Sequence, residues 1–255
     1  MNLLIDIGNT RLKWALTIDG QARPGGVFAH VGMPLALELR REWGELAGVD
    51  AVFVASVVSA AREGELDALL RERLDCPVHF VRSPAAALGI RNAYAEPHRL
   101  GVDRFLALAA AHARKPRLQV LISAGTALTV DAIDAEGDHL GGLIVASPQQ
   151  MRQALLAATA RVDAPGGQLR EIPRSTADAV LSGSLYAAVG AIARFRENVA
   201  RHCAAPPPPL LLGGGGGDEL ESLLAPVERV HDLVLHGLAL WAQAPSAAVV
   251  GDTRA

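Results

Sequence analysis

The residues with the clearest chemistry lie near the start of the chain, where a carboxylate ends a buried strand and a glycine turn follows. Backbone N–H groups in such a turn, with short polar side chains and cations beside them, are suited to phosphate oxygens. The carboxylate could hold Mg²⁺ against the same phosphates, directly or through water. An ordinary hairpin without a ligand is the alternative for this segment alone. The candidate phosphate-binding residues are Asp6, Ile7, Gly8, Asn9, Thr10, Arg11, Leu12 and Lys13, with Asp6 also the candidate metal ligand.

A similar segment returns at residues 121–130, about half the chain further on. When Gly8 is aligned with Gly125, Asp6 matches Ser123. Two similar hairpins predict two similar domains, with a nucleotide held between them by one turn from each. Chance similarity between two short apolar segments is the alternative.

Asp103 is the candidate catalytic residue, because it opens a predicted helix after a loop that contains Gly101. A carboxylate at a helix start stays ionised at neutral pH, as the acceptor of a hydroxyl proton in phosphoryl transfer must. The neighbouring Arg104 could neutralise an anionic group or orient a carboxylate. From spacing alone, a helix N-cap is the alternative role for Asp103, since Asp is favoured there.

Five consecutive glycines at 213–217 lie between a predicted strand and a predicted helix. The run lacks the Lys-Ser/Thr pair of a P-loop, so that motif is rejected. Glycines allow the backbone to approach a flat group such as adenosine closely, and a flexible loop is the alternative.

The composition is typical of a globular enzyme and excludes several other classes. The net charge is −3, aromatic residues make up 4% of the chain, and Lys and Arg are not clustered, so a nucleic-acid-binding surface is not expected. Cys76 and Cys203 are far apart, and the eight histidines show no zinc-ligand spacing, which favours a reduced, cytoplasmic setting. No apolar run approaches the roughly 20 residues that span a bilayer.

Strands and helices alternate along the chain, as expected of an α/β protein. Helices are predicted at 34–46, 63–74, 103–114, 149–159, 176–202, 218–224 and 231–242. Beyond the two hairpins, strands are predicted at 51–57, 78–81 and 210–212. The break at 115–117 marks a predicted boundary between an N-terminal domain, 1–116, and a C-terminal domain, 117–244, with a frayed tail at 245–255.

Five motifs extend the argument over nearly the whole chain. They are Asp6-Ile7-Gly8-Asn9-Thr10, Asn92-x-Tyr94-x-x-Pro97-x-x-Leu100-Gly101-x-Asp103-Arg104, Gly125-Thr126-Ala127 with Thr129-x-Asp131, Gly141-Gly142-x-Ile144, and Thr176-x-x-Ala179-x-x-Ser182-Gly183. In this order they resemble the motifs of type III pantothenate kinases, a family that includes proteins named Bvg accessory factors.

The resemblance implies an α/β fold of the acetate and sugar kinase, heat-shock and actin superfamily, with two ribonuclease-H-like domains around a nucleotide cleft. It also implies a homodimer that uses ATP and Mg²⁺ to phosphorylate pantothenate to 4'-phosphopantothenate, the first step of coenzyme A biosynthesis. The alternatives are another small-molecule kinase of the superfamily and a non-catalytic regulator like the Bvg accessory factors.

The family resemblance also implies roles for individual residues. Residues 6–13 would hold the ATP phosphates and the metal, and Thr126 would contact ATP from the second domain. Asp103 would be the general base, and Thr176 would contact pantothenate, supplied across the dimer. The residues implied to line the pantothenate pocket are Tyr94, Gly101, Val102, Asp103 and Arg104.

Two departures from the family pattern limit what is carried over. Many members have Asp where this chain has Ser123, and that Asp binds a monovalent cation such as K⁺ or NH₄⁺. A neutral hydroxyl removes the main electrostatic contribution to such a site, so weak or absent K⁺ activation is expected. The family usually has Pro-Gly after the Gly-Gly-x-Ile strand, whereas this chain has Ala146-Ser147-Pro148. A differently shaped loop is expected there.

Overall fold

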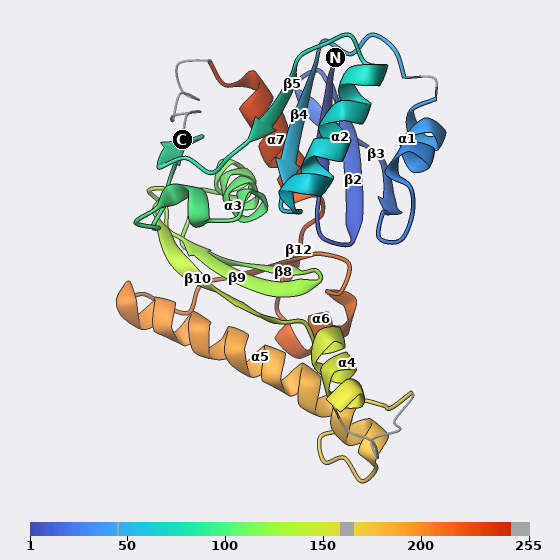
Figure 1. Cartoon of the computed structure of the whole chain (residues 1–255). Helices are drawn as coiled ribbons and strands as arrows, with labels where there is room; N and C mark the ends of the chain where they lie inside the picture. The colour runs from blue at the N-terminus through green and yellow to red at the C-terminus, as the bar shows by residue number, and fades with distance from the viewer. Residues whose placement is uncertain (45, 159–165, 246–255) are drawn as a thin grey trace. The chain divides into compact units, whose positions relative to one another are not determined.

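The computed structural model describes residues 1–44, 46–158 and 166–245, which form two compact units (Figure 1). The first unit contains residues 1–116, 135–139 and those from 232 on. The second unit contains residues 117–134 and 140–231. Each unit has its own sheet and its own hydrophobic core, and each is described by itself.

The first unit is built on a five-stranded sheet in the order β3-β2-β1-β4-β5. The hairpin strands β1, β2 and β3 pair antiparallel, whereas β4 and β5 continue the sheet in parallel with β1. The strands are β1 (Asn2–Ile7), β2 (Arg11–Ile18), β3 (Gln21–Ala29), β4 (Ala51–Ser56) and β5 (Val78–Val81).

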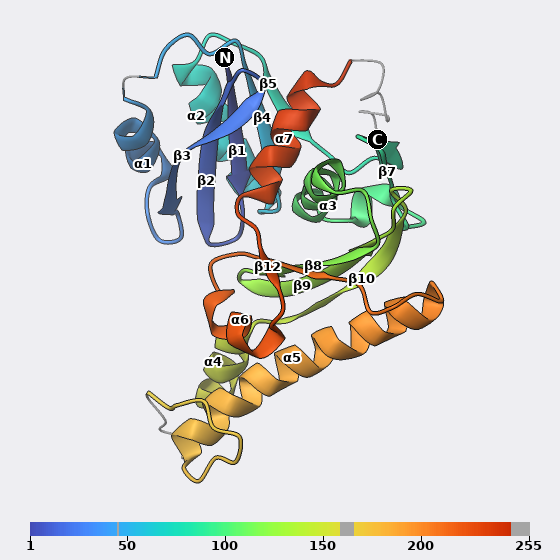
Figure 2. The same ribbon diagram turned by 180° about the vertical axis from the view of Figure 1, so that it is seen from behind.

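Helices cover both faces of this first sheet, with α1 and α2 on one face and α3 and α7 on the other (Figures 1 and 2). Side chains alternate between the faces of a strand. In β1 the buried Leu3, Ile5 and Ile7 join the core under α1 and α2. Asp6 therefore points to the face that α3 and α7 cover. The helices are α1 (Leu35–Trp43), α2 (Ala60–Arg73), α3 (Val102–Arg114) and α7 (Leu233–Gln243).

Between β5 and α3 the chain forms a small hairpin, β6 (Ala86–Ala87) with β7 (Ile90–Arg91), and a 3₁₀ turn, η1 (Pro97–Arg99). This stretch holds most of the motif that begins at Asn92.

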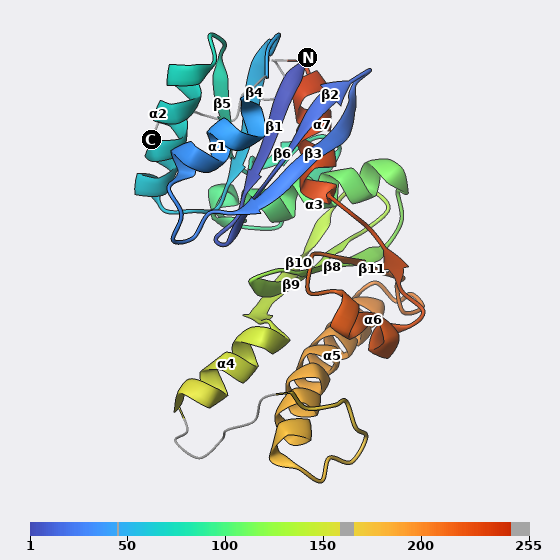
Figure 3. The same cartoon turned by 90° about the vertical axis from the view of Figure 1, so that its right-hand side faces the viewer.

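The second unit repeats the arrangement of the first, with a sheet in the order β10-β9-β8-β11-β12. Helices α5 and α6 lie on one face of this sheet, where their apolar residues complete the core (Figure 3). The elements are β8 (Gln119–Ala124), β9 (Ala127–Ile133), β10 (His139–Ala146), α4 (Pro148–Ala158), α5 (Thr176–His202), β11 (Leu210–Gly213), α6 (Asp218–Leu224) and β12 (Glu228–Arg229). The predicted α/β class and the internal duplication are confirmed.

Helix α5 departs from the expectation that no apolar run is long enough to span a bilayer. Among the described residues it is the one helix whose length and composition would allow it, and 28% of its most apolar 18-residue window is buried. One side of α5, including Leu185, Ala188 and Ile192, lies in the core of the second unit. The apolar residues on the other side of α5 are exposed and could be covered by another protein.

The structure places some elements differently from the sequence prediction. Strand β3 was not predicted, and α3 begins at Val102 rather than at Asp103. The two predicted continuous domains, 1–116 and 117–244, differ from the compact units, because α7 and residues 135–139 pack with the first unit. Thr159, the predicted end of a helix, and the predicted tail beyond residue 245 lie outside the described residues.

Candidate functional site

Asp6 and Lys13 lie side by side at the end of the first hairpin. Strands β1 and β2 pair Asp6 with Lys13, and the next pair is Ile7 with Leu12. Residues directly opposite in an antiparallel pair share a face of the sheet. The fully buried side chains of Ile7 and Leu12 fill the core under α1 and α2, so the carboxylate and the ammonium group share the other face. Only the backbone of Ile7 and Leu12 is available to a phosphate.

The turn that joins β1 and β2 is closed by its own backbone and supported by a buried histidine. The Gly8 N–H donates to the Arg11 carbonyl at 3.0 Å, and the His30 N–H donates to the Thr10 carbonyl at 3.2 Å. The His30 ring nitrogen Nε2 lies 2.7 Å from the Gly8 carbonyl oxygen. Asn9, Thr10 and Arg11 are exposed at this turn. The sequence does not predict His30 as part of this site, because it is a lone histidine 20 residues after Thr10 and belongs to no motif.

Asp103 lies in the first turn of α3, one residue after the helix begins. The N-cap of this helix is Gly101, so the alternative prediction that Asp103 is the N-cap residue is wrong. Its Oδ1 accepts a hydrogen bond of 2.8 Å from the Arg104 N–H. A Cβ atom at position 101 would lie 2.6 Å from that Oδ1. Glycine at 101 therefore leaves the space in which the Asp103 carboxylate sits.

A second carboxylate, Asp232, reaches the same place from the start of α7. Its Oδ1 lies 3.1 Å from Lys13 Nζ, and both side chains are about one-third exposed. Asp232 has φ +49° and ψ +34°, in the left-handed region that Asp tolerates better than most residues. Asp232 was missed from the sequence, because it lies 219 residues from its partner and in no recognised motif.

The pKa of Asp6 reflects this crowding of acidic groups. The pKa rises from its ordinary value of 3.8 to about 7, chiefly because the carboxyl group is buried; the charge of Asp103 and, less strongly, that of Asp232 also raise it, while Lys13 lowers it. Asp103 and Asp232 thus add negative charge around Asp6, and Lys13 adds positive charge. Such an excess of negative charge fits a bound cation. Among the described residues, however, no three acidic, histidine or cysteine side chains are close enough to hold a metal ion by themselves.

Tyr94 and Arg104 form a second cluster beside Asp103. The Arg104 side chain is buried, its Nη1 donates to the Tyr94 hydroxyl at 3.1 Å, and its guanidinium lies 5.8 Å from the centre of the Tyr94 ring. Asn92 fixes the loop: its amide donates to the carbonyls of Pro84 and Pro97, and its Oδ1 accepts from the Tyr94 N–H. The spacing of Asn92, Tyr94 and Pro97 is thus explained by one hydrogen-bonded loop.

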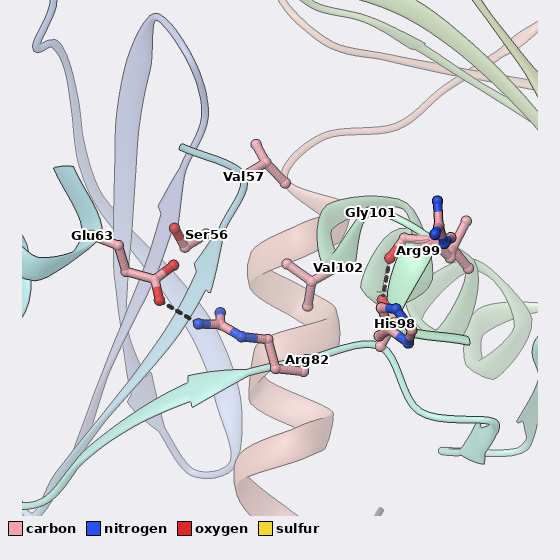
Figure 4. Close-up of a pocket in the computed structure, with 10 residues that line it drawn as sticks. Ser56, Val57, Glu63, Arg82, His98, Arg99, Gly101 and Val102 are labelled. Atoms are coloured by element: carbon pink, nitrogen blue, oxygen red, sulfur yellow. Dashed lines mark hydrogen bonds and ion pairs between the residues drawn. The ribbon is translucent and has the colours of Figure 1, made fainter. Parts of the chain in front are cut away.

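A cavity of about 180 Å³ adjoins the start of α3 (Figure 4). Its lining includes the predicted Gly101 and Val102, together with Ser56 at the end of β4. Arg82 and Glu63, which also line it, form an ion pair and point toward one another in Figure 4. The buried Ser56 hydroxyl has no hydrogen-bond partner within the described structure, so it could serve a polar ligand group.

In the second unit, the hairpin of β8 and β9 repeats the backbone of the first hairpin but not its charges. Strand pairing places Ser123 opposite Thr129, where the first unit has Asp6 opposite Lys13. A charged pair is thus replaced by two hydroxyl groups. Thr126 lies in the turn between these strands, and the Gly125 N–H closes the turn onto the Ala127 carbonyl.

The glycine run of the second unit packs against the end of β8. The Gly216 N–H donates to the Ala124 carbonyl at 2.9 Å, and a Cβ at Gly214 would lie 2.4 Å from that carbonyl oxygen. Close approach of two backbones therefore requires glycine at 214, where φ is +87°.

Two predicted features lie at helix starts in the second unit. Thr176 is the first residue of α5, and Ser175 caps this helix by accepting from the Asp178 N–H. Residues 146–148, where the sequence departs from the Pro-Gly of the family pattern, also have a structural explanation. Ser147 accepts from the Gln150 N–H, and Pro148 begins α4, so this loop is a helix start.

The chain matches the model of one protein family, described as type III pantothenate kinase, over residues 2–198. The chain belongs to this family. Type III pantothenate kinases similar to it include one from Xanthomonas campestris pv. campestris strain B100, 42% identical over 94% of this chain and 96% of the relative. Another, from Thiobacillus denitrificans, is 37% identical over 95% of this chain and 96% of the relative.

Solved structures show the same fold at lower identity. A Baf family protein from Campylobacter jejuni superposes with a TM-score of 0.57 and 20% identity, covering 92% of this chain and 94% of its own. Component A of (R)-2-hydroxyglutaryl-CoA dehydratase from Acidaminococcus fermentans gives a TM-score of 0.50 at 13% identity, covering 97% and 98%. The predicted two-domain, actin-like fold is confirmed. This type III pantothenate kinase is an enzyme that phosphorylates pantothenate with ATP in coenzyme A biosynthesis.

Proposed function

We propose that the first unit holds the ATP phosphates at the turn between β1 and β2 and presents the terminal hydroxyl of pantothenate to Asp103. The observation that carries this proposal is the convergence of Asp6, Lys13 and Asp103 from β1, β2 and α3. The phosphate contacts are assigned to the backbone of residues 7–12 and to the side chains of Asn9, Thr10, Arg11 and Lys13, where N–H, hydroxyl and cationic donors lie close together.

We infer that the divalent cation of this kinase is Mg²⁺ and that Asp6 holds it, directly or through water. The excess of acidic charge around Asp6 supports this assignment. One protein carboxylate is sufficient, since Mg²⁺ commonly uses one or two carboxylates together with substrate phosphates and water. When bound there, such a cation would supply positive charge to offset the charge that develops on the transferred phosphoryl group.

Asp103 is proposed to accept the proton of the attacking hydroxyl. Phosphoryl transfer depends mainly on positioning in line with the leaving group, and the base is needed only as the new bond forms. The hydrogen bond from the Arg104 N–H fixes one carboxylate oxygen of Asp103. The carboxylate would thereby orient a lone pair of the hydroxyl oxygen toward the phosphorus atom.

The rest of pantothenate is proposed to lie along Tyr94, the segment Gly101–Arg104 and the adjoining cavity. Arg104 would offset the negative charge of the substrate, and the Ser56 hydroxyl offers a polar contact in the cavity. In the second unit, Thr126 is the proposed ATP contact, and Thr176 is proposed to reach pantothenate in the partner subunit of a homodimer. Exposed apolar residues around α4 and α5 of the second unit support the dimer.

The pairing of Ser123 with Thr129 supports weak or absent activation by K⁺ or NH₄⁺. We expect turnover to change by less than about twofold when K⁺ replaces a large organic cation at constant ionic strength, because no carboxylate stands at position 123. A steep rise in turnover with K⁺ would contradict this expectation.

The proposal is tested by measuring ATP consumption in a coupled assay, with and without pantothenate, in the presence of Mg²⁺. Turnover that requires pantothenate is expected, and other alcohols should not replace it. ATP consumption that ignores pantothenate would overturn the assignment. We propose that the enzyme works in the cytoplasm and has no nucleic-acid or membrane partners.

A further inference from the structure

A short turn, residues 135–139, joins β9 to β10 but packs with the first unit. The Arg91 side chain forms an ion pair with Asp138, and this contact lowers the pKa of the Asp138 carboxyl. The Arg91 N–H donates to the Gly137 carbonyl at 2.9 Å. A Cβ at Gly137 would lie 1.9 Å from the Gly89 carbonyl oxygen, so the two backbones are in close contact. These contacts fix the 135–139 turn against the β6–β7 hairpin.

His139, which ends the 135–139 segment and begins β10, stacks on Tyr94. The two ring centres are 6.0 Å apart and the ring planes differ by 16°, and His139 is only 3% exposed. Tyr94 also receives the hydrogen bond and the guanidinium contact of Arg104. His139, Tyr94 and Arg104 are therefore linked in one series of contacts, from the 135–139 turn to the start of α3.

Building on the proposed function, we propose that His139 is a positioning residue for the acceptor substrate. Its ring holds the Tyr94 phenol in one orientation and, through it, the Arg104 guanidinium. Offset stacking of two flat rings restricts the rotation of each. Without it the Tyr94 side chain samples other orientations, and the cost falls on the binding of pantothenate. The ATP phosphates use other residues, so ATP binding is unaffected.

The test compares His139→Phe, which keeps a flat ring, with His139→Leu, which fills similar space without one. For the Leu variant we expect KM for pantothenate to rise about three- to tenfold, with kcat and KM for ATP within about twofold of the wild type. The Phe variant should stay within about twofold of the wild type in all three constants. Equal KM values for pantothenate in the two variants would overturn the proposal.

A second measurement does not depend on the identity of the substrate. Hydrogen–deuterium exchange of peptides covering residues 92–101 should be faster in the Leu variant than in the Phe variant. Equal exchange in both would overturn the role of the ring. If the wild type fails to use pantothenate, the proposed function fails by itself, and the exchange comparison still decides whether His139 orders Tyr94.

Discussion

The Asp103 carboxylate has a structural contact and a proposed chemical role that can be separated by one substitution. In Asp103→Asn the amide oxygen can still accept the 2.8 Å hydrogen bond from the Arg104 N–H, but the side chain can no longer accept a proton from substrate. We expect kcat to fall by about 10²–10⁴-fold, the usual contribution of a general base. Dissociation constants for ATP and pantothenate, measured by titration calorimetry, should change by less than about threefold. Near-normal turnover would remove Asp103 from the mechanism.

Asp6 should make the metal-free enzyme less stable at alkaline pH. Its folded-state pKa of about 7 lies above the ordinary value of 3.8. Asp6 is therefore harder to ionise in the folded protein than in the unfolded chain. Between about pH 4 and pH 7 the unfolded chain loses this proton while the folded protein keeps it, so the free energy of unfolding falls as the pH rises through this range. The full difference between the two pKa values corresponds to about 4 kcal/mol in the free energy of unfolding. Partial access of solvent to the Asp6 carboxyl reduces this cost, so we expect a loss of about 2 kcal/mol at pH 8.

Asp6→Asn removes this ionisation, so we expect the variant to be more stable than the wild type at pH 8 while losing activity. Urea unfolding in EDTA should show the gain of about 2 kcal/mol at pH 8, and the gain should shrink toward pH 5. Asp75→Asn, at an exposed position, is the matched control and should show no such pH-dependent gain. A variant less stable than the wild type at pH 8 would contradict the prediction.

At the scale of elements, the site depends on the packing of α3 against α7. Asp103 and Asp232 lie at the starts of these two helices, and Gly237 of α7 packs against α3. A Cβ at position 237 would lie 2.3 Å from the Leu106 carbonyl oxygen, so the helices can be this close only with glycine there.

Gly237→Ala is therefore expected to destabilise the protein by about 1–3 kcal/mol, the usual cost of overpacking, and to lower kcat because both carboxylates move. Gly64→Ala is the control, since that glycine lies inside α2 with open space around it. Alanine is favoured over glycine within a helix, so this control should gain up to about 1 kcal/mol. Thermal and urea unfolding measure both changes. A neutral Gly237→Ala would show that the helices can separate without loss.

Some of these elements could be predicted from the sequence and others could not. The hairpin around Asp6 and the loop around Tyr94 are local, because neighbours in sequence make their turns and hydrogen bonds. The pairing of Lys13 with Asp232 spans 219 residues, and no local pattern marks it. His139 likewise reaches Tyr94 only because the 135–139 turn packs with the first unit. Contacts of this kind follow from packing, which spacing alone does not specify.

At the scale of the whole molecule, two sheets with the same strand order have different charges. The first unit has Asp6 opposite Lys13, and the second has Ser123 opposite Thr129 at the matching place. The duplicated backbone thus forms two similar turns, but the acidic charge that fits a cation lies in the first. The second unit also exposes large apolar side chains around α4 and α5. They are Leu155, Leu156, Leu169, Ile172 and Tyr186.

These apolar residues predict that two copies of the chain associate through the second unit. Residues 168–170 lie against α5, where the Gln168 N–H donates to Asp178 and the Tyr186 hydroxyl donates to the Arg170 carbonyl. Ile172, which is 79% exposed, follows directly. Large exposed apolar groups next to one another are typical of an interaction surface.

Light scattering after gel filtration should give the mass of two chains for the wild type and of one chain for Ile172→Glu. A buried charge without a partner is costly at an interface, whereas an exposed one leaves the monomer folded. Turnover should fall with the dimer, because Thr176 is proposed to act in the partner subunit. Leu37→Glu on α1 is the control: Leu37 is 58% exposed in the first unit, and its variant should remain dimeric and active. A fully active monomeric Ile172→Glu would mean that each chain completes its own pantothenate site.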